Sequence, residues 1–380
     1  MKRTKNIFGF LVIVGMATLF IFSLPTANAE TRKIGVILAT TGRYASMGTG
    51  EKLGATLAVK KINAAGDVNG RKLEMIFEDD EGDPGKGSTA VRKLISVEKV
   101  SAIFGSSSNV VSHAMSLITE EMKVPIIAPV PSPKFVVGKR FAFQNVGSEV
   151  LLIGKVGHYF KDIKNYKKVG ILHDATEYGM NIAKGLGEWL AGKSITAVKA
   201  KFSPRASDVS PQWLILKKKK VEAVFLIGGP PMAPAIALKN RKQLGIDLPV
   251  IASPSLSNDK FLQLAGDAAE GIEMVSYFHY GKWTPGESAL IGYMKKEVPK
   301  VFPTLFHALG WDAIHLIAMA MEKAGNDPVK IRDELEKTKN YPGAVGKYNY
   351  SQTNHSGLGI EILTYVKVQN GKFQFIEEYK

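Results

Sequence analysis

Short apolar segments alternate with longer amphipathic segments along most of the chain, and this alternation restricts the possible folds more than any other feature. Residues 33–38 (KIGVIL) have the continuous apolar character of a strand that is buried on both faces. Residues 50–64 then place Leu53, Leu57 and Ile62 on one stripe of a helix. Parallel strands joined by helices give such a pattern. The chain is therefore predicted to have an α/β fold.

The pattern occurs in two consecutive series. In the first, strands are expected at 33–38, 72–79, 100–105 and 124–129, and helices at 50–64, 87–99 and 109–122. In the second, strands are expected at 167–174, 195–202, 221–229 and 248–254, and helices at 179–192, 208–219 and 232–244. A long helix at 304–324 and a strand pair near 360–368 and 372–378 follow. Two such series predict two Rossmann-like lobes with mainly parallel sheets. Ligands bind beyond the carboxyl ends of such strands, which suggests a cleft between the lobes.

The N-terminus has the layout of a secretory signal peptide. A basic start (MKRTK) precedes an apolar stretch at 7–24, and ANA at 27–29 supplies a small-x-small cleavage site. Cleavage is expected after Ala29, with export to the periplasm. An uncleaved anchor is the alternative, because 7–24 is about the minimum length for a membrane span.

Charge and composition exclude several function classes. The formal net charge is +15, and removal of Lys2, Arg3 and Lys5 with the signal peptide would leave +12. The lysines are scattered without interleaved aromatic residues, so no nucleic-acid partner is expected. The chain has no cysteine, which excludes disulfides, thiolate metal sites and a cysteine nucleophile.

Motifs for catalysis or metal binding are incomplete. No G-x-S-x-G, H-E-x-x-H or G-x-G-x-x-G pattern occurs. GDPGKGS at 82–88 has its lysine before the last glycine, so it is interpreted as a turn and a helix start rather than a phosphate-binding loop. EDDEGD at 78–83 lacks the glycine and the closing glutamate of a calcium loop. We expect neither an enzyme nor a cofactor or metal.

Three loops carry better signals for ligand binding. GSSSNVV places hydroxyls at the N-terminus of helix 109–122, where serine is an ordinary cap and where a ligand carboxylate would also be stabilised. IIAPVPSPKF at 126–135 holds Ser132 between prolines, directly after a strand. Tyr178 follows another strand end, although a tyrosine there is as often a core residue.

Together, these segments resemble the type I periplasmic solute-binding proteins of ABC importers, in the leucine/isoleucine/valine-binding branch. The matching stretches include IGVILATTGRYASMG, IFGSSS, VPIIAP, VGILHDATEYG and LAGDAAEG, in the order found in that family. The resemblance implies two lobes, one formed by 31–147 plus 278–357 and the other by 148–277 plus 358–380, that close around a ligand by a hinge motion. It also implies a membrane permease as partner, and a monomer is expected.

The resemblance also implies site residues. Ser108, Ser107 and Ser132 match positions that hold the head group of an amino-acid ligand in the family, and Tyr178 matches its cleft tyrosine. Four positions depart from the family: Pro254 stands where an acidic residue pairs with the ligand ammonium, Pro230 and Met47 replace aromatic residues, and Pro131 replaces a residue with a free N–H.

These departures favour a small carboxylate without an ammonium group, aromatic or branched aliphatic, because an unpaired ammonium in a closed cleft costs several kcal/mol. Its apolar part would contact Met47, Tyr44, Tyr178 and Pro230, and Arg43 is a candidate ion-pair partner. The alternative ligand is a branched-chain or other amino acid. The alternative classes are a sensory ligand-binding module and an exported α/β enzyme.

Overall fold

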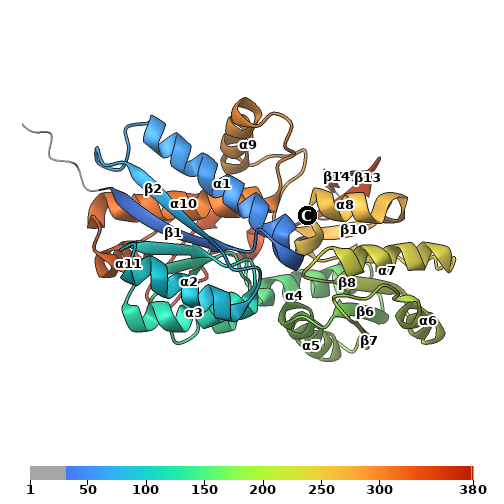
Figure 1. Ribbon diagram of the computed structural model, residues 1–380. Helices are drawn as coiled ribbons and strands as arrows, with labels where there is room; N and C mark the ends of the chain where they lie inside the picture. Colours follow the sequence, from blue (N-terminus) through green and yellow to red (C-terminus); the bar gives the residue numbers. More distant parts are fainter. Residues whose placement is uncertain (1–30, 378, 380) are drawn as a thin grey trace, which may run out of the picture.

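The computed structural model describes residues 31–377 and 379. The predicted signal peptide, 1–29, lies outside the described residues. Two lobes lie side by side, and each is built around its own sheet (Figure 1). In the described part of the chain, no helix is long and apolar enough to cross a membrane. The predicted α/β fold with mainly parallel sheets is confirmed.

The first sheet has five parallel strands in the order β2-β1-β3-β4-β5. These are β1 (Arg32–Leu38), β2 (Leu73–Asp79), β3 (Ala102–Gly105), β4 (Ile126–Ala128) and β5 (Ala142–Gln144). Side chains alternate between its two faces: Ile37 and Ile103 pack in one apolar cluster, whereas Val36 and Phe104 pack in the other. Helices α2 (Pro84–Ser96) and α3 (Asn109–Met122) contribute to the first cluster, and α1 (Ala45–Ala64) and α10 (Leu305–Ala324) to the second.

The second sheet has seven strands in the order β14-β13-β10-β9-β8-β6-β7. Its parallel part consists of β6 (Lys168–Asp174), β7 (Thr196–Phe202), β8 (Ala223–Ile227), β9 (Val250–Ala252) and β10 (Glu273–Ser276). The antiparallel pair β13 (Thr364–Gln369) and β14 (Lys372–Phe375) extends it at β10. The helices of this part are α4 (Glu149–His158), α5 (Glu177–Ala191), α6 (Ser210–Lys218), α7 (Met232–Gln243) and α8 (Asp259–Ala265).

The C-terminal third of the chain contributes to both lobes. It adds α9 (Pro285–Glu297), α11 (Pro328–Glu336) and the short pair β11 (Tyr341–Pro342) and β12 (Lys347–Tyr348) beside α10. The chain then returns to the second sheet through β13. The predicted lobe boundaries at 147/148, 277/278 and 357/358 fall between elements of the two sheets, although the exact division stays a prediction.

Capping explains where α2 begins. The Asp83 side chain accepts hydrogen bonds from the N–H groups of Gly85 (2.8 Å) and Lys86 (2.9 Å), and Pro84 occupies the first helical position. The predicted turn and helix start at 82–88 is therefore confirmed, with the helix beginning three residues earlier than expected. Helix α1 also begins earlier than expected, at Ala45, after a 3₁₀ turn at Gly42–Tyr44.

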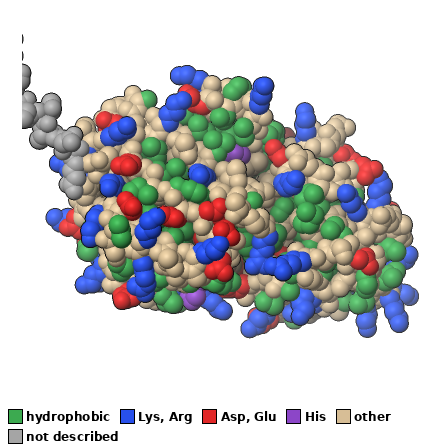
Figure 2. Space-filling view, viewed as in Figure 1, with side chains coloured by type: hydrophobic (Ala, Val, Ile, Leu, Met, Phe, Trp, Pro, Cys, Tyr) green, Lys and Arg blue, Asp and Glu red, His purple; other side chains and the backbone are tan. Residues whose placement is uncertain are grey.

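Buried hydrogen bonds join α10 to two segments of the first lobe. The Asp312 carboxylate on α10 accepts hydrogen bonds from the N–H groups of Ala344 (2.7 Å) and Val345 (2.8 Å) and from the Tyr348 hydroxyl (2.9 Å). The Tyr348 hydroxyl also donates to the Asn145 carbonyl in the first connecting segment (2.9 Å). Together, these bonds attach the turn between β11 and β12, and Asn145 after β5, to α10. On the face shown in Figure 2, Lys and Arg side chains are distributed over both lobes and mixed with Asp and Glu.

Candidate functional site

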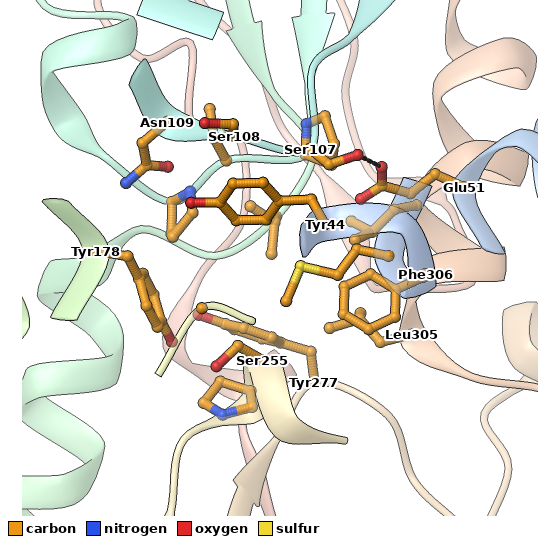
Figure 3. A pocket seen from close by; sticks show the side chains of 18 of the residues that line it. Tyr44, Glu51, Ser107, Ser108, Asn109, Tyr178, Ser255, Tyr277, Leu305 and Phe306 are labelled. Atoms are coloured by element: carbon orange, nitrogen blue, oxygen red, sulfur yellow. Dashed lines mark hydrogen bonds between the residues drawn. The ribbon is translucent and has the colours of Figure 1, made fainter. Parts of the chain in front are cut away.

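A pocket lies between the lobes, at the carboxyl ends of the parallel strands. It contains about 670 Å³ of space not filled by atoms, part of which is open to solvent. Figure 3 shows side chains from both lobes pointing into it. The lining residues are Tyr44, Met47, Glu51, Ser107, Ser108, Asn109, Val110, Pro129, Val130, Pro131, Val146, Glu177, Tyr178, Gly229, Pro254, Ser255, Tyr277, Leu305, Phe306 and Leu309.

The loop between β3 and α3 forms the polar part of the first-lobe wall. Gly105 has φ +135°, and a Cβ there would lie 1.8 Å from the Ile37 carbonyl oxygen, so only glycine fits. The Ser106 N–H donates to Ser112 Oγ (2.8 Å), and that hydroxyl donates back to the Ser106 carbonyl (2.9 Å). These bonds hold Ser107 and Ser108 at the N-terminus of α3.

Ser108 is the cap residue of α3, but its side chain makes no capping hydrogen bond. The first N–H groups of a helix have no acceptor within the helix, and the dipole there attracts negative charge. This end of the pocket can therefore hold an anionic group. The Ser108 side chain interacts with the Tyr44 hydroxyl, which partly offsets the effect of burial in raising the Tyr44 pKa.

Tyr44 reaches from the first lobe to the second. A Cβ added at Gly229 would lie 3.6 Å from the Tyr44 ring, and Asp174 is close enough to raise the pKa of Tyr44. Asp174 in turn organises the second-lobe loops, because its carboxylate accepts hydrogen bonds from the Thr176 hydroxyl (2.5 Å) and the Gly229 N–H (2.9 Å).

The second-lobe wall combines hydroxyls with apolar surface. Ser255 donates to the Gly228 carbonyl (2.6 Å), and its hydroxyl lies 2.7 Å from that of Ser253. Both serines interact with the hydroxyl of Tyr178, whose pKa is raised by burial. Pro254 lies between them and adds no donor or charge.

The remaining wall is apolar. Leu305, Phe306 and Leu309 come from the first turns of α10 and are buried. The ring of Tyr277 closes the pocket from the connection after β10, and its hydroxyl donates to the Gly147 carbonyl (3.0 Å). Together with Met47, these side chains give this end of the pocket an apolar surface.

Glu51 is the most unusual residue of the pocket. It lies on α1, one turn after Met47, and only 1% of its surface is exposed. The Ser107 hydroxyl donates to its carboxyl (2.5 Å; Figure 3). Burial raises the pKa of Glu51 to about 8, although the bond from Ser107 acts in the opposite direction. Its carboxyl is therefore mainly protonated at neutral pH.

A second buried acid lies just outside the lining, where α3 approaches α4 and α5. The Asn109 side chain donates to the Glu149 carboxyl (3.4 Å), and the Glu149 N–H donates to the Pro131 carbonyl (2.9 Å). Burial, reinforced by the neighbouring Glu177, raises the pKa of Glu149 to about 7. This group connects the proline loop, α3 and the second lobe.

Seven of the predicted site residues line the pocket, and their role in binding stays a prediction. They are Tyr44, Met47, Ser107, Ser108, Pro131, Tyr178 and Pro254. Three others lie elsewhere. The Ser132 hydroxyl is buried without a hydrogen-bond partner among the described residues. The Arg43 guanidinium lies over the Tyr44 ring (5.1 Å to its centroid), and Pro230 follows the lining residue Gly229.

Sequence reasoning missed the acids and most of the apolar wall. Glu177 carries no distinctive signal in the sequence, since a glutamate in the first turn of a helix is common. For Phe306 and Leu309, the sequence indicates only a long helix. For Glu51, its spacing of four residues from Met47 was a usable signal, because the two share a helix face. In the described part of the chain, no group of three or more His, Asp or Glu side chains is arranged to hold a metal ion.

Comparison with known proteins gives the family. Residues 31–372 match the Periplasmic binding protein family, and the chain belongs to it. It is 28% identical over 339 residues to the leucine-, isoleucine-, valine-, threonine-, and alanine-binding protein of Pseudomonas aeruginosa, with 88% of each chain covered. The leucine binding protein LivK of Thermotoga maritima has the same fold, with a TM-score of 0.84 at 23% identity over 91% of this chain and 98% of its own. A second structure is that of the branched-chain amino acid transporter substrate binding protein LivJ of Streptococcus pneumoniae, solved with isoleucine. Its TM-score is 0.82 at 25% identity, and the match covers 91% of this chain and 99% of LivJ.

These comparisons confirm the predicted family, which consists of solute-binding proteins of the branched-chain amino acid transport type. They support an amino-acid ligand better than the ammonium-free carboxylate predicted from Pro254. The structure also weakens the reason for that prediction, because Glu51 and Glu177 bring carboxyl groups into the same pocket from other elements.

Proposed function

We propose that this member of the periplasmic binding protein family is the receptor of a branched-chain-amino-acid-type ABC importer, and that it binds an apolar α-amino acid such as leucine, isoleucine or valine between its lobes. The observation that carries the proposal is the division of the pocket into three parts. The N-terminus of α3 with two serine hydroxyls, two carboxyl groups and an apolar wall surround one space.

Each part suits one part of an apolar amino acid. The ligand carboxylate would lie at the N-terminus of α3, near Ser107 and Ser108. The ammonium would face the acids Glu51 and Glu177, since neither lysine nor arginine is present among the lining residues described. The aliphatic side chain would lie against Leu305, and burial of apolar area would contribute about 25 cal/mol per Å².

An apolar monocarboxylate without an ammonium group is the second candidate. Two observations favour it: Pro254 offers no charge from the second lobe, and the high pKa of Glu51 leaves its carboxyl mainly neutral at pH 7. A neutral carboxylic acid can donate a hydrogen bond to a ligand carboxylate. An aromatic or branched aliphatic acid would then occupy the same apolar wall.

The remaining features belong to the same proposal. The chain would be exported with cleavage after Ala29, close its lobes (31–147 plus 278–357 and 148–277 plus 358–380) around the ligand, and deliver it as a monomer to a membrane permease without chemical turnover. The intact mass of the exported protein tests cleavage. Retention of residues 1–29 would favour an anchored sensory module, and product formation from a bound compound would favour an enzyme.

A thermal-shift panel tests the ligand class. Leucine, isoleucine and valine would be compared with 4-methylpentanoate, 3-methylbutanoate and benzoate. A ligand at a hundred times its dissociation constant adds roughly 2.7 kcal/mol of stability. The proposal expects the amino acids to raise the melting temperature more than their deaminated counterparts. Shifts only with the simple acids would establish the second candidate instead.

A further inference from the structure

Glu51 is held rigidly at the pocket wall. A Cβ added at Gly310 on α10 would lie 1.9 Å from the Glu51 carbonyl oxygen, so the two helices are in close contact at this residue. The side chain leaves α1 toward the pocket and meets Ser107, as Figure 3 shows. The backbone and the carboxyl group of Glu51 are therefore both held in place. A group held in this way can bind the head group of a ligand with a defined geometry.

Among the described residues, no basic side chain forms a hydrogen bond or an ion pair with this carboxyl, and the groups around it are neutral or acidic. Buried Asp80, after β2, raises the pKa of Glu51 further. The pocket is also lined by Tyr44, from the 3₁₀ turn before α1, and by Glu177 and Tyr178 from α5. Two further acids, Asp174 and Glu149, are not among the lining residues and contact them from behind. On α10, burial lowers the pKa of His307 to about 4, so that ring is neutral above pH 6.

Two basic side chains close in sequence to these residues lie over aromatic rings. The ammonium group of Lys52, the next residue, lies over the Phe77 ring (3.4 Å), and the Arg43 guanidinium lies over the Tyr44 ring (5.1 Å). A buried carboxylate without a nearby cation is costly and stays protonated. At neutral pH, a positive charge that arrives with the ligand would favour the carboxylate form.

We propose that Glu51 recognises the ammonium group of an amino-acid ligand, an inference that rests on the proposed function, and that binding releases the Glu51 proton to solvent. The proton balance is simple: the neutral carboxylic acid loses one proton, and the resulting carboxylate pairs with the ligand ammonium, which keeps its own protons. At neutral pH, the protein therefore releases nearly one proton for each amino acid that it binds. The bond from Ser107 stabilises the carboxylate once it has formed.

This coupling gives affinity a defined pH dependence. Because burial raises the pKa of Glu51 to about 8, the ionised fraction rises about 50-fold between pH 6 and pH 8. The apparent affinity for L-leucine should rise by a similar factor over that interval. The affinity for 4-methylpentanoate, which differs by the missing ammonium, should not rise.

The test is calorimetric titration of the full exported chain with L-leucine and 4-methylpentanoate at pH 6, 7 and 8, with two buffers of different ionisation enthalpy at pH 7. The wild type is compared with Glu51→Gln, which keeps shape and neutrality. Glu149→Gln is the control, because burial raises the pKa of Glu149 to about 7 and it titrates in the same interval. Loss of an acid from a buried charge pair should weaken L-leucine binding about 30-fold or more in Glu51→Gln at pH 8.

The inference expects proton release with L-leucine in the wild type and in Glu149→Gln, and neither proton release nor a pH slope in Glu51→Gln. If leucine binds without proton release, or if its pH slope disappears only in Glu149→Gln, the role of Glu51 is wrong while the proposed function stands. If leucine, isoleucine and valine do not bind at any pH and 4-methylpentanoate does, the proposed function fails and the inference fails with it.

Discussion

The stability of the ligand-free protein should fall unusually steeply between pH 5 and pH 8, and Glu51→Gln should remove a large part of that loss. Burial raises the Glu51 pKa from its ordinary 4.5 to about 8. The folded state therefore holds this proton more tightly than the unfolded chain. The resulting stabilisation is complete below pH 4.5 and is lost as pH rises toward 8.

The size of the effect follows from the same two values. One group has a pKa of 4.5 in the unfolded chain and about 8 in the folded protein. Proton linkage at this group lowers the free energy of unfolding by roughly 3 kcal/mol between pH 5 and pH 8. No correction for solvent screening is needed, because Glu51 is 1% exposed. Asp312 and Glu149, whose pKa values burial raises to about 6 and about 7, add losses of the same sign. Those losses are common to wild type and variant and cancel in the comparison.

Urea unfolding at pH 5, 6, 7 and 8 measures the difference between wild type and Glu51→Gln. The variant should gain about 3 kcal/mol relative to wild type over this range. Glu74→Gln, a change of the same kind at an exposed position of β2, controls for the removal of one charge. A difference for Glu51→Gln that stays constant to within about 0.5 kcal/mol from pH 5 to pH 8 would refute the reasoning, because no proton would then be held in the folded state.

Four further substitutions test other parts of the structure. Asp312→Ala leaves the N–H groups of Ala344 and Val345 buried without their acceptor, so urea unfolding should show a loss of about 2–6 kcal/mol; a loss under about 1 kcal/mol would contradict the anchoring role. Gly310→Ala places a Cβ 1.9 Å from the Glu51 carbonyl oxygen, so its melting temperature and L-leucine affinity should both fall, and wild-type values for both would be inconsistent with the close helix contact. Tyr178→Ala, in the pocket lining, should weaken binding of L-leucine about 10-fold or more in a calorimetric titration. Ser132→Ala, outside that lining, should have a smaller effect in the same titration. A larger effect of Ser132→Ala would indicate that the ligand binds closer to the proline loop.

The periodic elements were predictable because each buries a regular apolar face. Helix α3 was predicted with its observed bounds, since Ser108 precedes it and Val111, Met115 and Ile118 share one face. The three-residue strand β5 was missed, because a segment so short has no detectable period. Helix α9 was missed although Thr284 and Glu287 form a capping box, because the apolar residues after it are few.

The site was predictable only where it follows strand ends. Ser107, Ser108 and Tyr178 follow β3 and β6, so topology alone brings them to the cleft. Glu51 and Phe306 lie on helices that are distant in sequence, and they reach the pocket because glycines allow α1 and α10 to approach closely. That approach is a tertiary contact, and the glutamate in a helix would otherwise be interpreted as a solvent-exposed charge.

The central claim is that an apolar amino acid binds in the pocket between the lobes. Its most direct test is calorimetric titration of L-leucine into the wild type and Tyr178→Ala at pH 8. The proposed function predicts saturable binding of one leucine per wild-type chain, with a negative heat-capacity change from apolar burial and a clear loss of affinity in Tyr178→Ala. Absence of binding by leucine, isoleucine and valine, together with saturable binding of 4-methylpentanoate, would contradict it.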